Sequence, residues 1–284
     1  MLTGAAPPAA RRAAVLGKPI GHSLSPVIHN AGFAAAGLPG WSYVAIECAE
    51  AELAGLVDGL GPEWAGLSLT MPLKQEALRL AAVASPVARA TGAANTLVRR
   101  DGGGWFADNT DVAGMVRVLR AAGLGGSGSP SVTVLGGGGT ARAALAAAAR
   151  LGAAEVTVVT RRAAARDELI PAAEALGVTL AGADWPDAAG LFDADAVIST
   201  VPKGAADHLA GQVAWRSGTV LFDAIYDPWP TPLAAAAAAA GVPVVSGLDL
   251  LLAQALSQFE QFTGVAPAPE PAMRAALFEA AGRP

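Results

Sequence analysis

The stretch VTVLGGGGTARAALAAAARLG, residues 132–152, decides the fold of this chain, because a strand-like run, four glycines and an alanine-rich run follow one another in it. That order predicts a strand, a tight turn and a helix, the arrangement that a dinucleotide site requires. Gly136 permits the tight turn, and Gly138 lets backbone N–H groups approach a pyrophosphate at the helix start. The pattern is G-x-G-G-x-A, and it includes Gly139, Thr140 and Ala141. It predicts a dinucleotide site, although glycine-rich turns also occur in purely structural α/β units.

The next strand-like run, AEVTVVTRR at 154–162, indicates which dinucleotide would bind. Sites for NAD usually place an acidic residue there, where it binds the adenosine ribose hydroxyls. This run instead ends in Thr160, Arg161 and Arg162, with no carboxylate to repel a phosphate. Because arginines suit a ribose 2′-phosphate, the sequence predicts NADP. The alternative is a solvated basic turn.

Strand-like and alanine-rich helical runs alternate on both sides of this stretch, which predicts an α/β fold with parallel sheets. Ahead of it we expect strands at 13–17, 41–47 and 66–70, and helices at 26–37, near 50–60 and from residue 72. Residues 93–111 should form a hairpin around a glycine-rich turn, before a helix at 112–123 and a loop at 125–130. After it, a second α/β series extends to about residue 246, and a helix at 248–262 and a short C-terminal helix follow.

Composition excludes several classes of protein. The chain has 284 residues, a formal charge of −5 and a pI of about 5.2, so it lacks the basic footprint of a nucleic-acid-binding protein. Its single cysteine, Cys48, excludes an intrachain disulfide framework and fits a reducing compartment. No stretch is typical of a membrane span. Residues 1–12 place Pro-Pro and Arg-Arg in the reverse order of a secretory signal, so we expect a disordered lead-in and a cytoplasmic location.

The segment GHSLSPVIHN, residues 21–30, holds two of the three histidines and two serines. Ser25 followed by Pro26 predicts a helix start, with the serine as N-cap and the proline at the first helical position. His22, Ser23 and His29 are not needed for that start. Taken alone, the segment favours turn and surface positions for these three residues.

Two further segments carry groups that could do chemistry. In LSLTMPLKQE (67–76) a strand ends at Thr70, and Lys74 follows at a helix start, where stability rules favour acids instead. In ADNTDVAG (107–114) one interpretation of Asp111 is that it does no more than cap the next helix. A lysine and an aspartate that met at a nicotinamide would instead form a proton relay for alcohol oxidation. The histidines predict no metal site, because His22 and His29 lack partners at ligand spacing and His208 is isolated.

Taken together, these segments resemble the shikimate dehydrogenase family. The matching motifs, in the family's order from Val15 to about Pro271, are GKPIGHSLSPVIHN, LTMPLK, GAANTL, DNTDVAG, GGGGTAR, FDAIYDPWPTPL and GLDLLLAQALSQFEQFTG. The resemblance implies that Ser23 and Ser25 contact the substrate carboxylate. It implies that the ring hydroxyls and carbonyl are bound by Thr70, Asn95, Asp111 and Gln254, with a further contact from Tyr226. It makes Lys74 the catalytic lysine and Asp111 its partner, and it implies that the cofactor is also contacted by Ser199, Thr200, Val201, Ile225 and Gly247.

The sequence departs from the family pattern in three places. Ser68 stands where asparagine is common, and the loop ISTVPKG (198–204) stands where many members have asparagine-alanine-threonine. Thr160 replaces an asparagine beside Arg161. None of these changes affects Lys74 or Asp111.

We therefore expect a two-domain α/β oxidoreductase that reduces 3-dehydroshikimate with NADPH. Residues 1–111 and 247–284 should form the substrate domain and residues 112–246 a Rossmann-type, doubly wound NADP domain, with the active site in the cleft between them. The alternatives are a quinate/shikimate dehydrogenase that prefers NAD, and a non-catalytic NADP-sensing module on the same fold. No heptad or apolar stripe indicates an interface, so a monomer and a homodimer both stay open.

Overall fold

The computed structural model describes residues 10–125 and 128–282, which divide into two compact units. The first unit takes the described residues of Met1–Ser85, Ala93–Thr110 and Ala255–Pro284, and the second takes Pro86–Gly92 and those of Asp111–Gln254. Residues 1–9 of the expected lead-in, and residues 126–127 of the expected loop, lie outside the described residues. The lead-in is wrong for Arg11 and Arg12, because both already belong to the first strand, where their backbone N–H groups donate to carbonyl oxygens.

The sheet of the first unit has the strand order β2-β1-β3-β5-β6-β4. Its strands are β1 (Arg11–Gly17), β2 (Trp41–Glu47), β3 (Trp64–Leu69), β4 (Val83–Ala84), β5 (Thr96–Arg99) and β6 (Trp105–Asp108). β1 is parallel to β2 and β3, whereas β5 is antiparallel to both β3 and β6. The hairpin predicted for residues 93–111 is therefore confirmed, and it makes this sheet mixed rather than parallel throughout. Gly103 and Gly104 close the turn with positive φ values of 86° and 72°, which glycine adopts without strain.

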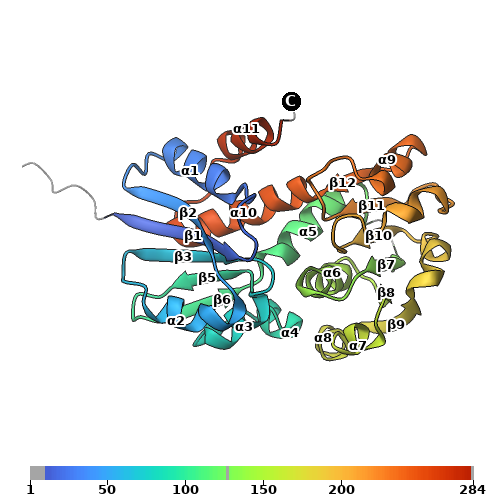
Figure 1. The fold of residues 1–284 in the computed structure, drawn as a ribbon, viewed down its shortest axis with the longest axis horizontal. Coiled ribbons are helices and arrows are strands. Elements are labelled where there is room, and N and C mark those ends of the chain that lie inside the picture. Colours follow the sequence, from blue (N-terminus) through green and yellow to red (C-terminus); the bar gives the residue numbers. More distant parts are fainter. Residues whose placement is uncertain (1–9, 126–127, 283–284) are drawn as a thin grey trace, which may run out of the picture. The chain divides into compact units, whose positions relative to one another are not determined.

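Helices cover both faces of this sheet (Figure 1). They are α1 (Ser25–Ala35), α2 (Leu53–Asp58, after the 3-10 turn η1 at Glu50–Glu52), α3 (Lys74–Leu80) and α11 (Glu270–Ala280). α10 (Gly247–Thr263) adds its second half, since Ala255 onward counts with this unit. Two glycines let the layers approach closely: a Cβ at Gly32 of α1 would lie 3.0 Å from Met273 Sδ, and a Cβ at Gly66 of β3 would overlap the Phe262 ring.

The second unit contains a fully parallel sheet with the order β12-β11-β10-β7-β8-β9. Its strands are β7 (Val132–Leu135), β8 (Glu155–Thr160), β9 (Thr179–Asp184), β10 (Ala196–Ser199), β11 (Val220–Asp223) and β12 (Val244–Ser246). Counted from β7, this is the doubly wound strand order of dinucleotide-binding sheets. The first three strands are added toward one edge of the sheet, and the next three are added toward the other edge. The fold class predicted from the glycine-rich stretch is confirmed, and the switch point lies between β7 and β10.

The helices of the second unit flank this sheet (Figure 1). They are α4 (Pro86–Thr91), α5 (Thr110–Ala121), α6 (Gly139–Arg150), α7 (Ala163–Asp167), α8 (Ile170–Leu176) and α9 (Pro232–Ala239), with 3-10 turns η2 (Trp185–Leu191) and η3 (Asp207–Gly211). None of the helices within residues 10–125 and 128–282 is both long enough and apolar enough to cross a membrane.

The division of the chain differs from the expected boundaries at α4 and at the first half of α10. Residues 86–92 count with the second unit because α4 packs on α6 and α8. The buried Arg142 of α6 strengthens this contact: its Nη1 donates to Thr91 O of α4 at 3.3 Å, and its Nη2 donates to Glu168 O at 2.8 Å. Neither α4 nor the short strand β4 was predicted, because the two elements are too short to show a hydrophobic period.

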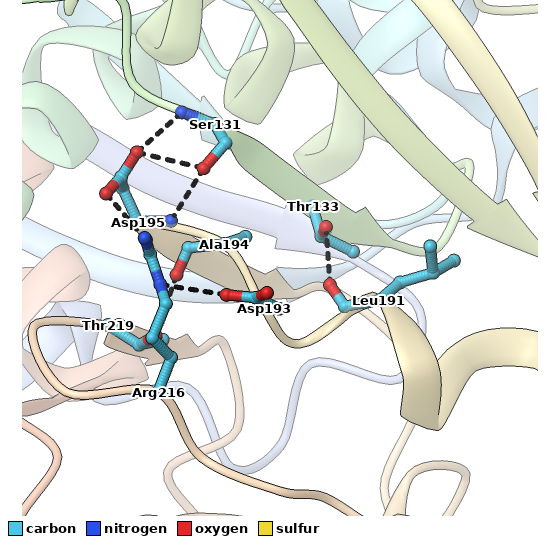
Figure 2. A network of polar contacts seen from close by, with 8 residues as sticks. All are labelled: Ser131, Thr133, Leu191, Asp193, Ala194, Asp195, Arg216 and Thr219. Carbon is cyan, nitrogen blue, oxygen red and sulfur yellow. Dashed lines mark hydrogen bonds and ion pairs between the residues drawn. The ribbon is translucent and has the colours of Figure 1, made fainter.

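A polar network holds the amino ends of the strands in the second sheet (Figure 2). The backbone N–H and the hydroxyl of Ser131 donate to Asp195 Oδ2 at 2.8 and 2.9 Å, and Arg216 Nη2 donates to Asp195 Oδ1 at 2.6 Å. These hydrogen bonds, chiefly the one from the Ser131 backbone, hold the pKa of Asp195 below its usual value. The network joins the starts of β7 and β10, and it leaves their carboxyl ends to form the site described next.

Candidate functional site

The glycine-rich turn lies at the switch point of the second sheet, directly after β7. Gly136 has a φ of +110°, and a Cβ there would lie 2.6 Å from Thr200 Oγ1. Thr200 follows β10, and both its backbone N–H and its hydroxyl donate to Leu135 O, at 2.9 and 2.8 Å. The loops after β7 and β10 therefore lie against each other, and only glycine fits at position 136.

The start of α6 is suited to an anion. Gly138 is its N-cap with a φ of −89°, no side chain caps the helix, and its first turn contains no acidic residue. A Cβ at Gly138 would meet nothing within 4 Å, so the space above this residue is open. The first N–H groups of a helix have no partner within it and carry partial positive charge. A pyrophosphate would therefore fit this turn, which also includes Gly139 and Thr140, while the buried Ala141 packs beneath it.

The end of β8 presents two exposed cations. Thr160 is buried, and its hydroxyl donates to Arg162 O at 2.9 Å, so this side chain holds the turn instead of pointing outward. Arg161 and Arg162 are exposed, and the helix α7 that follows has no acidic residue in its first turn. The arrangement leaves both guanidinium groups able to meet a phosphate, whereas the Thr160 hydroxyl is bonded to the backbone of Arg162.

Sequence reasoning missed Asp223, the last residue of β11. Its Oδ2 accepts a hydrogen bond from Thr231 Oγ1 at 2.7 Å, and its Oδ1 accepts one from Ile225 N at 3.2 Å. Ser199 also bonds to this carboxylate, while burial raises the pKa of Asp223. Asp223 therefore fixes the loop that carries Ile225 and Tyr226. The sequence signal that could have found it is an aspartate at the end of an apolar strand, followed by a threonine at the start of the next helix.

Gly247 begins α10 and lies against the same loop. Its N–H donates to Ile225 O at 3.3 Å, and a Cβ there would overlap Ala224 O. This residue, predicted to contact the cofactor, therefore has a packing reason to be glycine. Val201 is half-buried in the loop after β10, beside Thr200.

In the first unit, three chain segments meet at the end of β3. Thr70 N donates to Leu16 O at 2.9 Å, and a Cβ at Gly17 would overlap the Thr70 methyl group. The half-buried Lys74 is the first residue of α3, and its carbonyl accepts a hydrogen bond from Ala94 N at 2.7 Å. These contacts place Thr70 and Lys74 beside the loop that leads to Asn95.

The start of α1 corrects two expectations. Ser25 lies within the helix and does not cap it, and Leu24 holds the N-cap position without a side-chain hydrogen bond. The hydroxyl of Ser23 accepts instead from Ser25 N at 3.3 Å, so Ser23 is the serine that meets a helix-start amide. His29 is fully buried, not at the surface, and its ring stacks on Tyr43 with centroids 4.2 Å apart.

Asp111 and Gln254 lie on two helices of the second unit that approach closely. A Cβ at Gly114 of α5 would lie 3.2 Å from Gln254 N of α10, so glycine permits this contact. Asp111 is the second residue of α5 and is 6% exposed; the helix begins at Thr110, which excludes the simple N-cap interpretation. Burial raises the pKa of Tyr226 in the same unit.

Within residues 10–125 and 128–282, no three His, Cys, Asp or Glu side chains lie together in a way that could hold a metal ion. The candidate site is thus built from hydroxyl, amide, carboxylate and cationic groups and from backbone N–H groups. In the second unit they lie at the carboxyl ends of parallel strands, where doubly wound sheets bind ligands.

Comparison with known proteins identifies the family. The model described as shikimate dehydrogenase substrate binding domain matches residues 15–97, and that described as shikimate 5'-dehydrogenase C-terminal domain matches residues 247–278. A curated relative from Caulobacter vibrioides, named shikimate dehydrogenase (NADP(+)), is 38% identical over 277 residues, which are 95% of this chain and 95% of the relative.

Solved structures agree with this result. The crystal structure of Mycobacterium tuberculosis shikimate dehydrogenase is 45% identical, with a TM-score of 0.85 over 95% of this chain and 99% of that one. Shikimate 5-dehydrogenase from Thermus thermophilus, solved in complex with shikimate, is 30% identical, with a TM-score of 0.80 over 96% of this chain and 99% of that one. This chain therefore belongs to the shikimate dehydrogenase family.

Proposed function

We propose that this chain catalyses the reversible, NADPH-dependent reduction of 3-dehydroshikimate to shikimate, a step of chorismate and aromatic amino acid biosynthesis. The observation that carries the proposal is the match to NADP(+)-linked shikimate dehydrogenases along almost the whole length of both chains. The glycine-rich turn, the open start of α6 and the two arginines after β8 support the same cofactor on independent physical grounds.

In this proposal residues 112–246 hold NADP and residues 1–111 and 247–284 hold the substrate. The pyrophosphate would lie on the glycine-rich turn and the 2′-phosphate on Arg161 and Arg162. Ser23 and Ser25 would bind the substrate carboxylate. The ring oxygens would be bound by Thr70, Asn95, Asp111, Tyr226 and Gln254, whose hydroxyl, amide and carboxylate groups can donate and accept hydrogen bonds.

Reduction of the carbonyl needs a hydride and a proton, and NADPH, when bound, supplies the hydride. Lys74 donates the proton to the carbonyl oxygen, and takes a proton from the hydroxyl when the reaction runs as an oxidation. Asp111 accepts a hydrogen bond from that hydroxyl and so orients it. The position of Lys74 at the first residue of α3, tied through its carbonyl to Ala94, restricts the backbone from which its side chain extends.

Steady-state kinetics with shikimate and quinate, each with NADP and NAD, tests the function. We expect the highest kcat/KM for shikimate with NADP. Arg161→Ala should raise the KM for NADP about tenfold or more, because a charge-assisted hydrogen bond contributes about 1.5–3 kcal/mol, and should leave the KM for NAD nearly unchanged. Equal losses with both cofactors would remove the 2′-phosphate assignment. Preference for NAD, or NADPH binding without turnover, would favour the two alternative functions.

Two glycine variants separate cofactor binding from folding. Gly136→Ala should lower the free energy of unfolding by about 1–3 kcal/mol, because a non-glycine residue at a φ of +110° is strained and its Cβ would crowd Thr200. Gly138→Ala should leave stability unchanged, since its φ is negative and nothing lies within 4 Å of the added carbon. Both should weaken NADPH binding. Denaturant unfolding and fluorescence titration measure the two effects; full NADPH affinity in Gly138→Ala would contradict the pyrophosphate position.

A cytoplasmic location and a monomeric or homodimeric state stay predictions. Analytical ultracentrifugation at several protein concentrations distinguishes the two oligomeric states.

A further inference from the structure

A buried chain of hydrogen bonds crosses the first unit from β2 to the loop before β5. Tyr43 Oη donates to Ser68 Oγ at 2.6 Å, and Ser68 Oγ donates to Gln258 Oε1 at 2.7 Å. Gln258 Nε2 then donates to Thr96 Oγ1 at 2.9 Å, and Thr96 Oγ1 donates to Asn95 Oδ1 at 2.7 Å. Each hydroxyl accepts one bond and donates the next, so the donors all run in one direction and strengthen one another.

The chain ends at Asn95 and determines how its amide is oriented. Asn95 Oδ1 accepts not only from Thr96 but also from Thr110 N at 2.8 Å and from Thr110 Oγ1 at 3.1 Å. With three donors on the oxygen, a flipped amide would direct its NH₂ group at other donors. Asn95 is therefore held with Nδ2 on the opposite side, and it can act on a ligand only as a hydrogen-bond donor.

Gln258 holds the backbone of Asn95 as well as its side chain. Its Nε2 also donates to Asn95 O at 3.2 Å, the same carbonyl that accepts from Leu69 N at 2.8 Å. The Gln258 side chain is completely buried. Its amide thus contacts β3, through Ser68, and also both the backbone carbonyl of Asn95 and the Thr96 hydroxyl that donates to Asn95.

We propose that Gln258 is a positioning residue, which orients the Asn95 amide so that Nδ2 donates to a ring oxygen of the substrate. This inference rests on the proposed function, in which Asn95 contacts that ring. It also explains Ser68, which stands where asparagine is common in the family. A serine is short enough to leave room for the Gln258 amide, and its hydroxyl passes the hydrogen bond from Tyr43 onward. Ser68 and Gln258 therefore act as a pair.

The Tyr43 end of the chain reaches another position in the proposed site. The Ser25 hydroxyl also bonds to Tyr43 Oη, and since the single phenol proton goes to Ser68, Ser25 donates this bond. When Ser25 binds a carboxylate, its proton turns from Tyr43 to the substrate, because a carboxylate only accepts hydrogen bonds. Ser25 and Asn95, which we propose bind opposite ends of the substrate, are thus joined by one buried path that passes through Gln258.

The test is Gln258→Met, which keeps the length of the side chain and removes its hydrogen bonds. We expect the KM for shikimate to rise about two- to tenfold, since about one hydrogen bond to substrate is misaligned, with a smaller change in kcat and an unchanged dissociation constant for NADPH. Gln261→Met is the matched control, because Gln261 lies one turn farther along α10 and donates to Asp108 Oδ2 at 2.9 Å, away from Asn95. The control should keep the KM of the wild type.

The same substitution in an Asn95→Ala background distinguishes positioning from general stability. If Gln258 acts through Asn95, Gln258→Met should raise the KM little further once Asn95 is absent. An equal factor in both backgrounds, or an unchanged KM in Gln258→Met alone, would overturn the inference. Should Gln258→Met fail to fold, Thr96→Val removes the hydroxyl between Gln258 and Asn95, and the same outcomes apply to it. Absence of shikimate turnover by the wild-type enzyme would instead refute the proposed function.

Discussion

Replacing Lys74 with alanine is expected to lower turnover of shikimate at least a hundredfold. A positioned general acid–base group contributes roughly a hundred- to ten-thousand-fold, and Lys74 is the group that we propose carries the proton. In the proposed site other residues hold the substrate through its carboxylate and ring oxygens, so the KM for shikimate should change much less than kcat. That split identifies a group used mainly in the transition state. Stopped-flow and steady-state assays of NADPH formation measure it.

Two further variants make the Lys74 result specific. Lys74→Arg should restore little activity, because a guanidinium stays protonated and cannot accept the proton that oxidation releases. Gln75→Ala, at the next and exposed position of α3, should keep the turnover of the wild type. A Lys74→Ala enzyme with more than about a tenth of the normal turnover would leave the mechanism without its proton carrier, since a tenfold step is only about 1.4 kcal/mol.

The stability of the protein should fall steeply below pH 6.5 because of His29. Its ring is completely buried against Tyr43, and neither nitrogen has a well-formed hydrogen bond. The Gln258 amide favours the protonated ring slightly, but desolvation is the larger effect and lowers the pKa of His29 to about 3. Above pH 6.5 His29 is neutral in both states and has no effect on the pH dependence. As the pH falls towards 3, only the unfolded chain takes up the proton, which favours unfolding.

The expected slope is about 1.4 kcal/mol of unfolding free energy per pH unit, or about 2 kcal/mol lost between pH 6.5 and pH 5. His29→Phe keeps an aromatic ring against Tyr43 and removes the titration, so its stability should be flatter over this range. His208→Asn, at an exposed position, should retain the wild-type slope. Urea unfolding at half-unit pH intervals measures these slopes, and parallel curves for His29→Phe and the wild type would show that His29 is not the cause.

Local signals in the sequence were enough to determine the fold class and several of its elements. The run 132–152 predicted β7, the turn and α6 because glycines, strand formers and alanines follow one another within a single supersecondary unit. The strand predicted at 41–47 is confirmed as β2, and the hairpin at 93–111 is confirmed as β5 and β6. Each of these rests on neighbouring residues alone. The family followed from seven motifs in order, while the roles of the individual site residues stay predictions.

Only the tertiary structure decided what lies opposite each polar side chain. The sequence suggested Ser25 as a helix cap and His29 as a surface residue, but Ser23 meets the helix-start amide and His29 is buried beside Tyr43. Gln258 reads as one more residue of an amphipathic helix, yet its amide meets Ser68, 190 positions earlier, and Asn95, 163 positions earlier. Periodicity and capping rules describe residues a few positions apart, whereas the burial of a polar group depends on partners that folding brings from distant strands.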